Sequence, residues 1–142
     1  MSDQITFTEV QLIDKHFRLL YSSLSNRRFN ISHENTPSFE EHLKFVRNHP
    51  YRIWVLVEMN QISLGNFYIQ QDNSIGVNVE EEYLEHLPTI VDMISKKWDP
   101  LPPIPSLRNK NFFMNVSREN NKLISVIKRM GAKHIQSSYL LK

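Results

Sequence analysis

The chain has 142 residues, of which 40% are hydrophobic and 23% are charged, and a formal net charge of +2. This length and composition indicate one globular domain over residues 1–142 with a real hydrophobic core. The absence of cysteine excludes disulfides and thiolate metal sites, and no apolar run is long enough to span a bilayer. The N-terminus has no basic start followed by an apolar stretch, so we expect a soluble, cytoplasmic protein with no membrane partner.

The charges are distributed unevenly along the chain. Residues 72–95 carry six acidic side chains and no basic ones, whereas residues 96–142 carry ten basic and two acidic ones. Such asymmetry either steers an anionic ligand toward the C-terminal third or reflects chance clustering on a solvated surface. Because the basic residues form no run interleaved with aromatic residues, we expect no nucleic-acid partner.

The first half of the chain alternates between strand and helix patterns. Ile5 and Phe7 predict a short first strand, and apolar residues at helical spacing predict an amphipathic helix over 12–24. Ser38, with Glu41 three residues later, forms the capping box of a second helix. The segment 51–59 is apolar on both alternating faces, which indicates a central strand covered on both sides.

Polar turns join this strand to two more. Asn60-Gln61 and Asp72-Asn73 predict turns that make a three-strand meander ending near residue 79. Residues 88–98 have a helical apolar pattern, and a proline-rich connection, "WDPLPPIPSLRNK", follows them.

The C-terminal third predicts a strand, a helix and a closing strand. "NFFMNV" (111–116) has the pattern of a fifth strand, and "SSYLL" (137–141) that of a last one. Ser117 is a candidate N-cap for the helix between them, and Gly131 stands where a C-cap glycine belongs. The order β-α-α-β-β-β-α-β-α-β predicts a mixed α/β fold with a mostly antiparallel central sheet and helices on both faces.

The sequence lacks the common signatures of metal and phosphate sites. The six histidines form no HxH pair and no HExxH motif, so we expect no metal. No GxSxG nucleophile elbow and no P-loop is present, and three glycines cannot build a glycine-rich phosphate loop.

Residues 115–133, "NVSRENNKLISVIKRMGAK", resemble the C-terminal motif of the GNAT N-acetyltransferases, VxxxN…Gly-Phe. Val116 is followed four residues later by Asn120, and Asn120 is followed eleven residues later by Gly131, with an apolar helical stripe between them. The order of elements agrees with the GNAT fold over nearly the whole chain. Residues 38–67 are also similar to the second helix and next two strands of GNAT enzymes that acetylate amino groups of nucleotide-linked sugars.

The resemblance implies an acyltransferase that uses acetyl-coenzyme A as co-substrate. In the family this molecule lies between splayed fourth and fifth strands, and the acceptor amine attacks the thioester directly. By analogy, Val77, Asn78 and Val79 lie beside the thioester and pantetheine arm, and Asn120 meets the pantetheine or pyrophosphate side. Glu80 and Asn78 are the catalytic candidates, although a glutamate in such an acidic loop is more often a solvated charge than a base, and Asn78 is equally plausible as a polar pocket residue.

The resemblance also implies an acceptor pocket. The segment from Arg27 to Asn35, with Arg27, Arg28 and Asn30, lines that pocket together with Tyr68 of the meander. The implied partner is a small-molecule primary amine, with an amino sugar or a nucleotide-linked sugar as one candidate and a homodimer as one option for assembly.

Three positions depart from the family. The glycine-rich pyrophosphate loop is replaced by "EEEYLEHLP" (80–88), Ile127 stands where many members have a tyrosine acid, and Ala132 stands where an aromatic residue follows the glycine. Glycines let backbone N–H groups approach phosphate, and nearby carboxylates repel it. The sequence therefore predicts an N-acyltransferase, with a GNAT-fold binding or assembly module that has lost acetyl-coenzyme A as the alternative.

Overall fold

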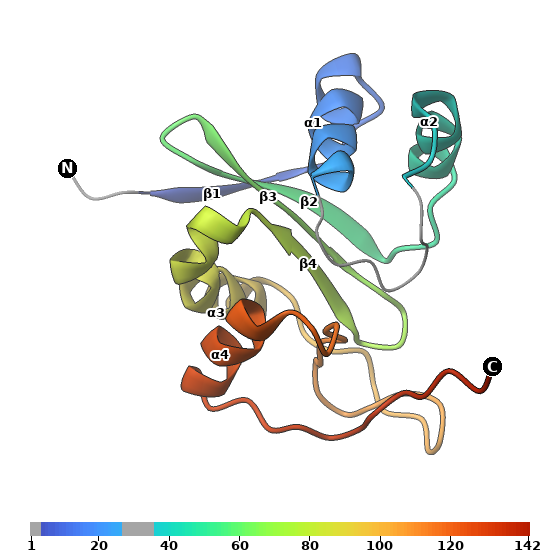
Figure 1. The fold of residues 1–142 in the computed structure, drawn as a ribbon, viewed down its shortest axis with the longest axis vertical. Coiled ribbons are helices and arrows are strands. Elements are labelled where there is room, and N and C mark those ends of the chain that lie inside the picture. The colour runs from blue at the N-terminus through green and yellow to red at the C-terminus, as the bar shows by residue number, and fades with distance from the viewer. Residues whose placement is uncertain (1–3, 27–35) are drawn as a thin grey trace.

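The protein is built on a four-stranded antiparallel sheet in the order β1-β2-β3-β4 (Figure 1), seen in a computed structural model that describes residues 4–26 and 36–142. The strands are β1 (Ile5–Glu9), β2 (Ile53–Met59), β3 (Ile62–Ile69) and β4 (Ile75–Val79). The helices are α1 (Asp14–Ser25), α2 (Phe39–Arg47), the 3-10 helix η1 (Glu81–His86), α3 (Leu87–Lys97) and α4 (Asn121–Arg129).

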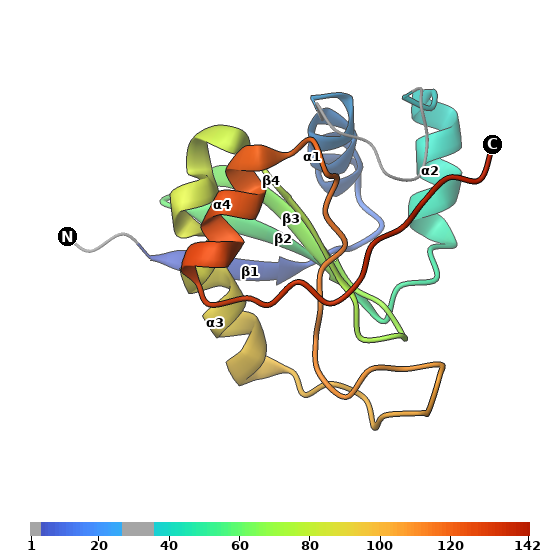
Figure 2. The ribbon, with the colours of Figure 1, turned by 60° about the horizontal axis from the view of Figure 1, so that its bottom comes forward.

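Helices cover both faces of the sheet, as predicted (Figures 1 and 2). Trp54 and Leu56 of β2 pack against α1 and α2, whereas Val55 and Val57 pack toward α3. Successive side chains of a strand point to opposite faces, so a strand that is apolar at every position must be covered twice. A third apolar cluster joins α3 to α4 through Leu87, Leu123 and Val126. The predicted mixed α/β fold is confirmed.

The hairpin turns follow from their residues. Asn60 and Gln61 adopt φ angles of 53° and 67°, the left-handed pair that a two-residue hairpin between twisted strands requires. Asn73 also has a positive φ, of 73°, and it is fully buried. Its side-chain amide donates to the backbone oxygens of Leu101 and Asn109 and accepts from the Leu101 N–H, at 2.8–2.9 Å. The β3–β4 turn thereby holds the proline-rich connection.

The helix caps are partly as predicted. The Ser38 Oγ accepts from the Glu41 N–H at 3.2 Å and caps α2. The prediction that Ser117 caps α4 is wrong, because Asn120 is the N-cap and its Oδ1 accepts from the Leu123 N–H at 3.3 Å. Gly131 closes the same helix with a φ of 88°. The N–H groups of residues 131 and 132 donate to the carbonyl oxygens of residues 128 and 127, which is a Schellman motif.

The two C-terminal strands predicted from the sequence do not form. Residues 111–116 pair with the sheet through a single parallel bridge between Ser74 and Phe113, after which the chain leaves β4. Residues 137–141 belong to no strand, and Tyr139, Leu140 and Leu141 are more than 80% exposed. Both segments have β-forming residues, but a strand also needs a partner edge, which neither finds over its length.

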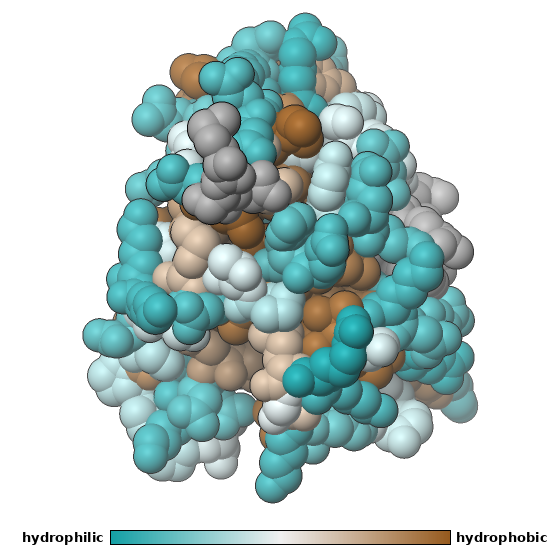
Figure 3. All heavy atoms as spheres, turned by 90° about the vertical axis from the view of Figure 1, so that its left-hand side faces the viewer, coloured by the Kyte–Doolittle hydropathy of each residue, from teal (hydrophilic) through white to brown (hydrophobic). Residues whose placement is uncertain are grey.

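The surface is mixed in character. Figure 3 shows one side of the molecule, where hydrophilic residues surround separate, small apolar patches. Within the described ranges, none of the helices combines the length and the apolar composition needed to cross a bilayer.

Two glycines of this fold differ in what an added methyl group would meet. A Cβ on Gly65, whose φ is +136°, would lie 2.0 Å from the backbone oxygen of Asn78, whereas a Cβ on Gly131 would meet no atom within 4 Å. We expect Gly131→Ala to lower the free energy of unfolding by about 1–2 kcal/mol, the cost of the left-handed conformation alone. Gly65→Ala should cost at least about 2 kcal/mol more, because β3 and β4 must also separate.

Denaturant titration of both variants measures this difference. Equal losses of stability would contradict the close approach of Gly65 to β4.

Candidate functional site

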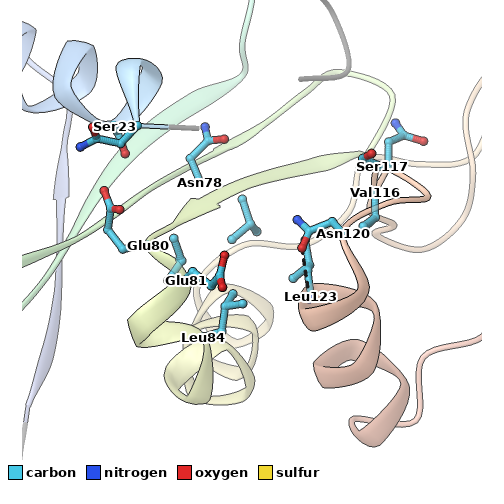
Figure 4. A pocket seen from close by; sticks show the side chains of 13 residues that line it. Ser23, Asn78, Glu80, Glu81, Leu84, Val116, Ser117, Asn120 and Leu123 are labelled. Atoms are coloured by element: carbon cyan, nitrogen blue, oxygen red, sulfur yellow. Dashed lines mark hydrogen bonds between the residues drawn. The ribbon is translucent and has the colours of Figure 1, made fainter. Parts of the chain in front are cut away.

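A small cavity of about 150 Å³ opens where the chain after Phe113 leaves β4. We call it the β4–α4 cavity. Figure 4 shows Asn78 and Glu80 pointing from the end of β4 toward Ser23 of α1, while Val116, Ser117 and Asn120 approach from the start of α4. Its lining comes from α1, from β4 and η1, and from the segment that leads into α4: Ser23, Asn26, Val77, Asn78, Val79, Glu80, Glu81, Leu84, Asn115, Val116, Ser117, Asn120 and Leu123.

The free edge of β4 supplies backbone donors to this cavity. The Glu80 N–H donates to Leu64 of β3, whereas the Ile75 N–H donates to Phe113 on the other side. Backbone groups alternate between the two sides of an antiparallel strand, so the N–H groups of Val77 and Val79 point away from β3. Both residues line the cavity. This arrangement can hold a carbonyl oxygen by hydrogen bonds from the strand.

Glu80 carries the perturbed carboxyl group of the cavity. Partial burial, and then the charge of Glu82, raise the pKa of the Glu80 carboxyl above its ordinary value. A carboxylate with a raised pKa is a better proton acceptor near neutral pH. The Asn78 side chain lies on the same side of the strand, where its Nδ2 donates to the Asn66 Oδ1 at 3.2 Å.

Asn120 both caps α4 and lines the cavity. Its Oδ1 is engaged with the Leu123 N–H, so the side-chain group it offers to a ligand is the Nδ2 donor.

The turn after β4 has no phosphate cradle of the kind predicted for the family. Residues 80–86 form the start and body of η1, and none of them has the positive φ that a nest of backbone N–H groups uses. The Glu81 carboxylate instead pairs with the Lys122 ammonium group on the first turn of α4. The residues of η1 therefore do not fit a diphosphate, whereas the neighbouring edge of β4 has outward-facing N–H groups.

A second and larger cavity of about 660 Å³ lies between α1, α2 and the sheet. We call it the α2–β2 cavity. Tyr68, the predicted substrate residue, lines it, and Asn78 lines both cavities. The described part of the lining is mainly aromatic and polar: Leu20, Leu24, Thr36, Pro37, Ser38, Glu41, His42, Phe45, Tyr51, Trp54, Asn66, Tyr68 and Asn78.

The structure brings together the residues predicted for the donor side, namely Val77, Asn78, Val79, Glu80 and Asn120. Their roles stay predictions. The predicted acceptor residues Arg27, Arg28 and Asn30 lie outside the residues that the structure describes. Among the described histidines and carboxylates, no three come together in a way that could hold a metal ion.

The sequence-based prediction missed His42, Tyr51 and Trp54. They come from α2, the connection after it, and β2, and their sequence patterns are those of ordinary core positions. The signal that was available is the density of aromatic residues and histidine over residues 39–54.

No protein-family model and no curated protein sequence matches the chain. Two solved structures align with nearly all of it. A domain from Methanocaldococcus jannaschii DSM 2661 is 15% identical, with a TM-score of 0.69, and the alignment covers 96% of this chain and 93% of that one. A possible acetyltransferase from Clostridium difficile 630 is 10% identical, with a TM-score of 0.55 and coverage of 97% and 96%. The chain therefore has a mixed α/β fold like that of a possible acetyltransferase.

The histidines near the α2–β2 cavity give the protein a pH dependence. Burial lowers the pKa of His42, an effect that its hydrogen bond to the Phe17 backbone partly offsets, and burial also lowers the pKa of His49. The unfolded chain therefore binds more protons than the native one as the pH falls below about 6.5. The contribution of these two histidines to the free energy of unfolding is fully present above that pH and is lost as the pH falls toward their native pKa values.

We expect His42→Asn to reduce the loss of unfolding free energy between pH 7.5 and 5.5. Over this range the reduction is at most about 1.4 kcal/mol, because the imidazole of the unfolded chain begins to take up its proton only near pH 6.5. Denaturant titrations of the wild type and the variant across this range measure it. Above pH 7.5 the free energy of unfolding should change with pH equally in the wild type and the variant. An equal change below pH 6.5 would contradict a buried, neutral His42.

Proposed function

We propose that this chain is an N-acyltransferase that moves an acetyl group from acetyl-coenzyme A to a primary amine of a small molecule. The observation that carries the proposal is the meeting of two cavities at one side chain, Asn78. A group-transfer enzyme without a covalent intermediate needs two substrates that meet at one point. The β4–α4 cavity suits the acyl donor, and the α2–β2 cavity suits the acceptor.

The chain's own residues support a direct transfer. The backbone N–H groups of Val77 and Val79 would donate to the thioester carbonyl oxygen as it gains negative charge. The acceptor nitrogen would attack the carbonyl carbon, the carbon–sulfur bond would break, and the thiolate would leave and take up a proton. Glu80 would accept the proton that the acceptor nitrogen loses, directly or through water.

A second function, a GNAT-fold binding or assembly module without acyl transfer, has its own observation in favour. Glu81 and Lys122 pair across the place where the family holds a diphosphate, and η1 offers no glycine turn. Binding of the acyl donor therefore decides between the two functions. An amino sugar remains one candidate acceptor for the enzyme.

We expect acetyl-coenzyme A to bind and raise the melting temperature, because a ligand of the native state stabilises it. Asn120→Ser keeps the cap oxygen but removes the Nδ2 donor, so it should weaken binding by about 3–10-fold while stability changes little. Asn120→Ala should weaken binding similarly and also lower stability by about 1 kcal/mol.

Isothermal titration calorimetry and denaturant titration of the same preparations separate the two effects. If folded protein shows no heat of binding at high micromolar acetyl-coenzyme A, the proposed enzyme function is wrong and the non-catalytic module is favoured. Unchanged affinity in both variants would remove Asn120 from the donor site.

The proposed base gives a second test. With any accepted amine, kcat/KM should rise with pH through the raised pKa of Glu80. Glu80→Gln should remove that rise and lower the rate by about 100-fold or more. Glu82→Gln is the matched control, because it removes the charge that helps raise the Glu80 pKa and should move the midpoint to lower pH with little loss of rate. A Glu80→Gln enzyme with the wild-type profile would exclude Glu80 as the base.

A further inference from the structure

The α2–β2 cavity has the size and the walls of a small-molecule site. Its volume of about 660 Å³ lies within the range of ordinary ligand pockets, which are mostly apolar with a few placed polar groups. It reaches the β4–α4 cavity at Asn78 but is otherwise lined by different described residues.

Aromatic side chains build a rigid wall of this cavity. The rings of Tyr51 and Tyr68 stack at 3.9 Å with an angle of 4° between their planes. Trp54 meets Tyr51 edge-on at 5.1 Å, and its Nε1 donates to the Asn66 Oδ1 at 3.0 Å. Phe45, which is 45% exposed, also lines the cavity and packs edge-on against Trp54 at 5.9 Å. Rings fixed in this way suit a flat or apolar ligand body, because little entropy is lost when it binds.

One buried polar atom in the lining lacks a partner. His42 is only 4% exposed, and its Nε2 has no hydrogen bond among the described residues. In the tautomer that carries its proton on Nδ1, Nε2 has a lone pair and what it lacks is a donor. A ligand that offers an N–H or O–H to this buried acceptor would remove the cost of leaving it unsatisfied.

The charge in the lining is negative. Apart from His42, Glu41 is the one ionisable acid or base other than tyrosine among the described lining residues. A carboxylate at the mouth favours a cation and disfavours an anion, and aromatic faces also favour an ammonium group.

We propose that the α2–β2 cavity binds a small primary amine with an aromatic or compact apolar body, and that His42 and Glu41 recognise its nitrogen. The rings of Tyr51, Trp54 and Phe45 hold the body of the amine, His42 Nε2 accepts one of its N–H groups, and the Glu41 carboxylate holds its positive charge. Binding of the amine stands without catalysis. That the amine is the acyl acceptor rests on the proposed function.

This assignment differs from a sugar or nucleotide ligand. A sugar ring needs many polar partners around it, and a diphosphate needs cationic ones. The described lining offers stacked aromatic rings, one orphan acceptor and one carboxylate. These groups fit a cation with an apolar body.

Binding of probe molecules in the absence of any acyl donor tests the proposal. The probes are 2-phenylethylamine, its uncharged analogue 2-phenylethanol, the anion 3-phenylpropionate, and glucosamine. The chain has two tryptophans, and Trp98 packs in the core on the other face of the sheet. In a Trp98→Phe background, the emission of Trp54 therefore reports on the cavity, with calorimetry as a second readout.

We expect 2-phenylethylamine to bind at least about tenfold more tightly than the other three probes. Glu41→Gln should abolish its advantage over 2-phenylethanol, whereas Glu40→Gln, the same change one residue earlier and outside the cavity, should retain it. His42→Asn keeps a donor for Phe17 but deletes the atom at Nε2, so it should weaken binding about 3–10-fold. His42→Gln restores an amide near the Nε2 position and should recover part of the loss.

Three results would overturn the proposal: no probe bound at millimolar concentration by folded protein, glucosamine or the anion bound most tightly, or equal effects of Glu41→Gln and Glu40→Gln. None of these depends on acetyl-coenzyme A, so a protein that binds the amine but not the donor would overturn only the proposed transferase.

Discussion

The buried side chain of Asn73 fixes where the chain that follows α3 returns to the sheet. Its amide group makes three hydrogen bonds to the backbone of residues 101 and 109, more than 25 residues away in sequence. Buried polar groups are costly unless they are satisfied, and a satisfied set specifies one arrangement. The neighbouring backbone then pairs with Phe113 through the bridge at Ser74. Within the described chain, the backbone of the returning segment pairs with the sheet only at this end of β4, and the β4–α4 cavity lies toward the other end.

The local features that the sequence predicts well do not depend on this anchor. The double-faced strand β2, the Ser38 cap, the turn at Asn60 and the C-cap at Gly131 each depend on residues within a few positions of one another. Such features follow from the residue types themselves: the alternating apolar pattern of a strand, a short polar side chain at a helix cap, and residues that tolerate a left-handed backbone at turns. They were predicted correctly, and with them the mixed α/β fold.

The features that failed depend on distant partners. "NFFMNV" reads as a strand, but a strand forms only where a neighbouring edge is in register, and here one residue, Phe113, reaches β4. Ser117 and Asn120 are both capable N-caps. The Ser117 Oγ accepts from the Glu119 N–H at 3.4 Å within its own turn, and the helix begins after Asn120. The α2–β2 cavity was missed for the same reason, because its rings and His42 converge only in three dimensions.

The acidic turn after β4 was the strongest sequence argument against an acyl donor, and its pairing with α4 changes the weight of that argument. The two oppositely charged parts of the chain meet at Glu81 and Lys122, so one of the carboxylates is already neutralised by a cation. The Lys122 side chain is 69% exposed, and an exposed ion pair contributes only about 0–1 kcal/mol. Opening it would cost little and would free an ammonium group beside the N-terminus of α4. The other carboxylates of this turn stay beside that place, so for the proposed transferase most of the binding energy would have to come from the edge of β4, where the N–H groups of Val77 and Val79 bond to none of the described residues.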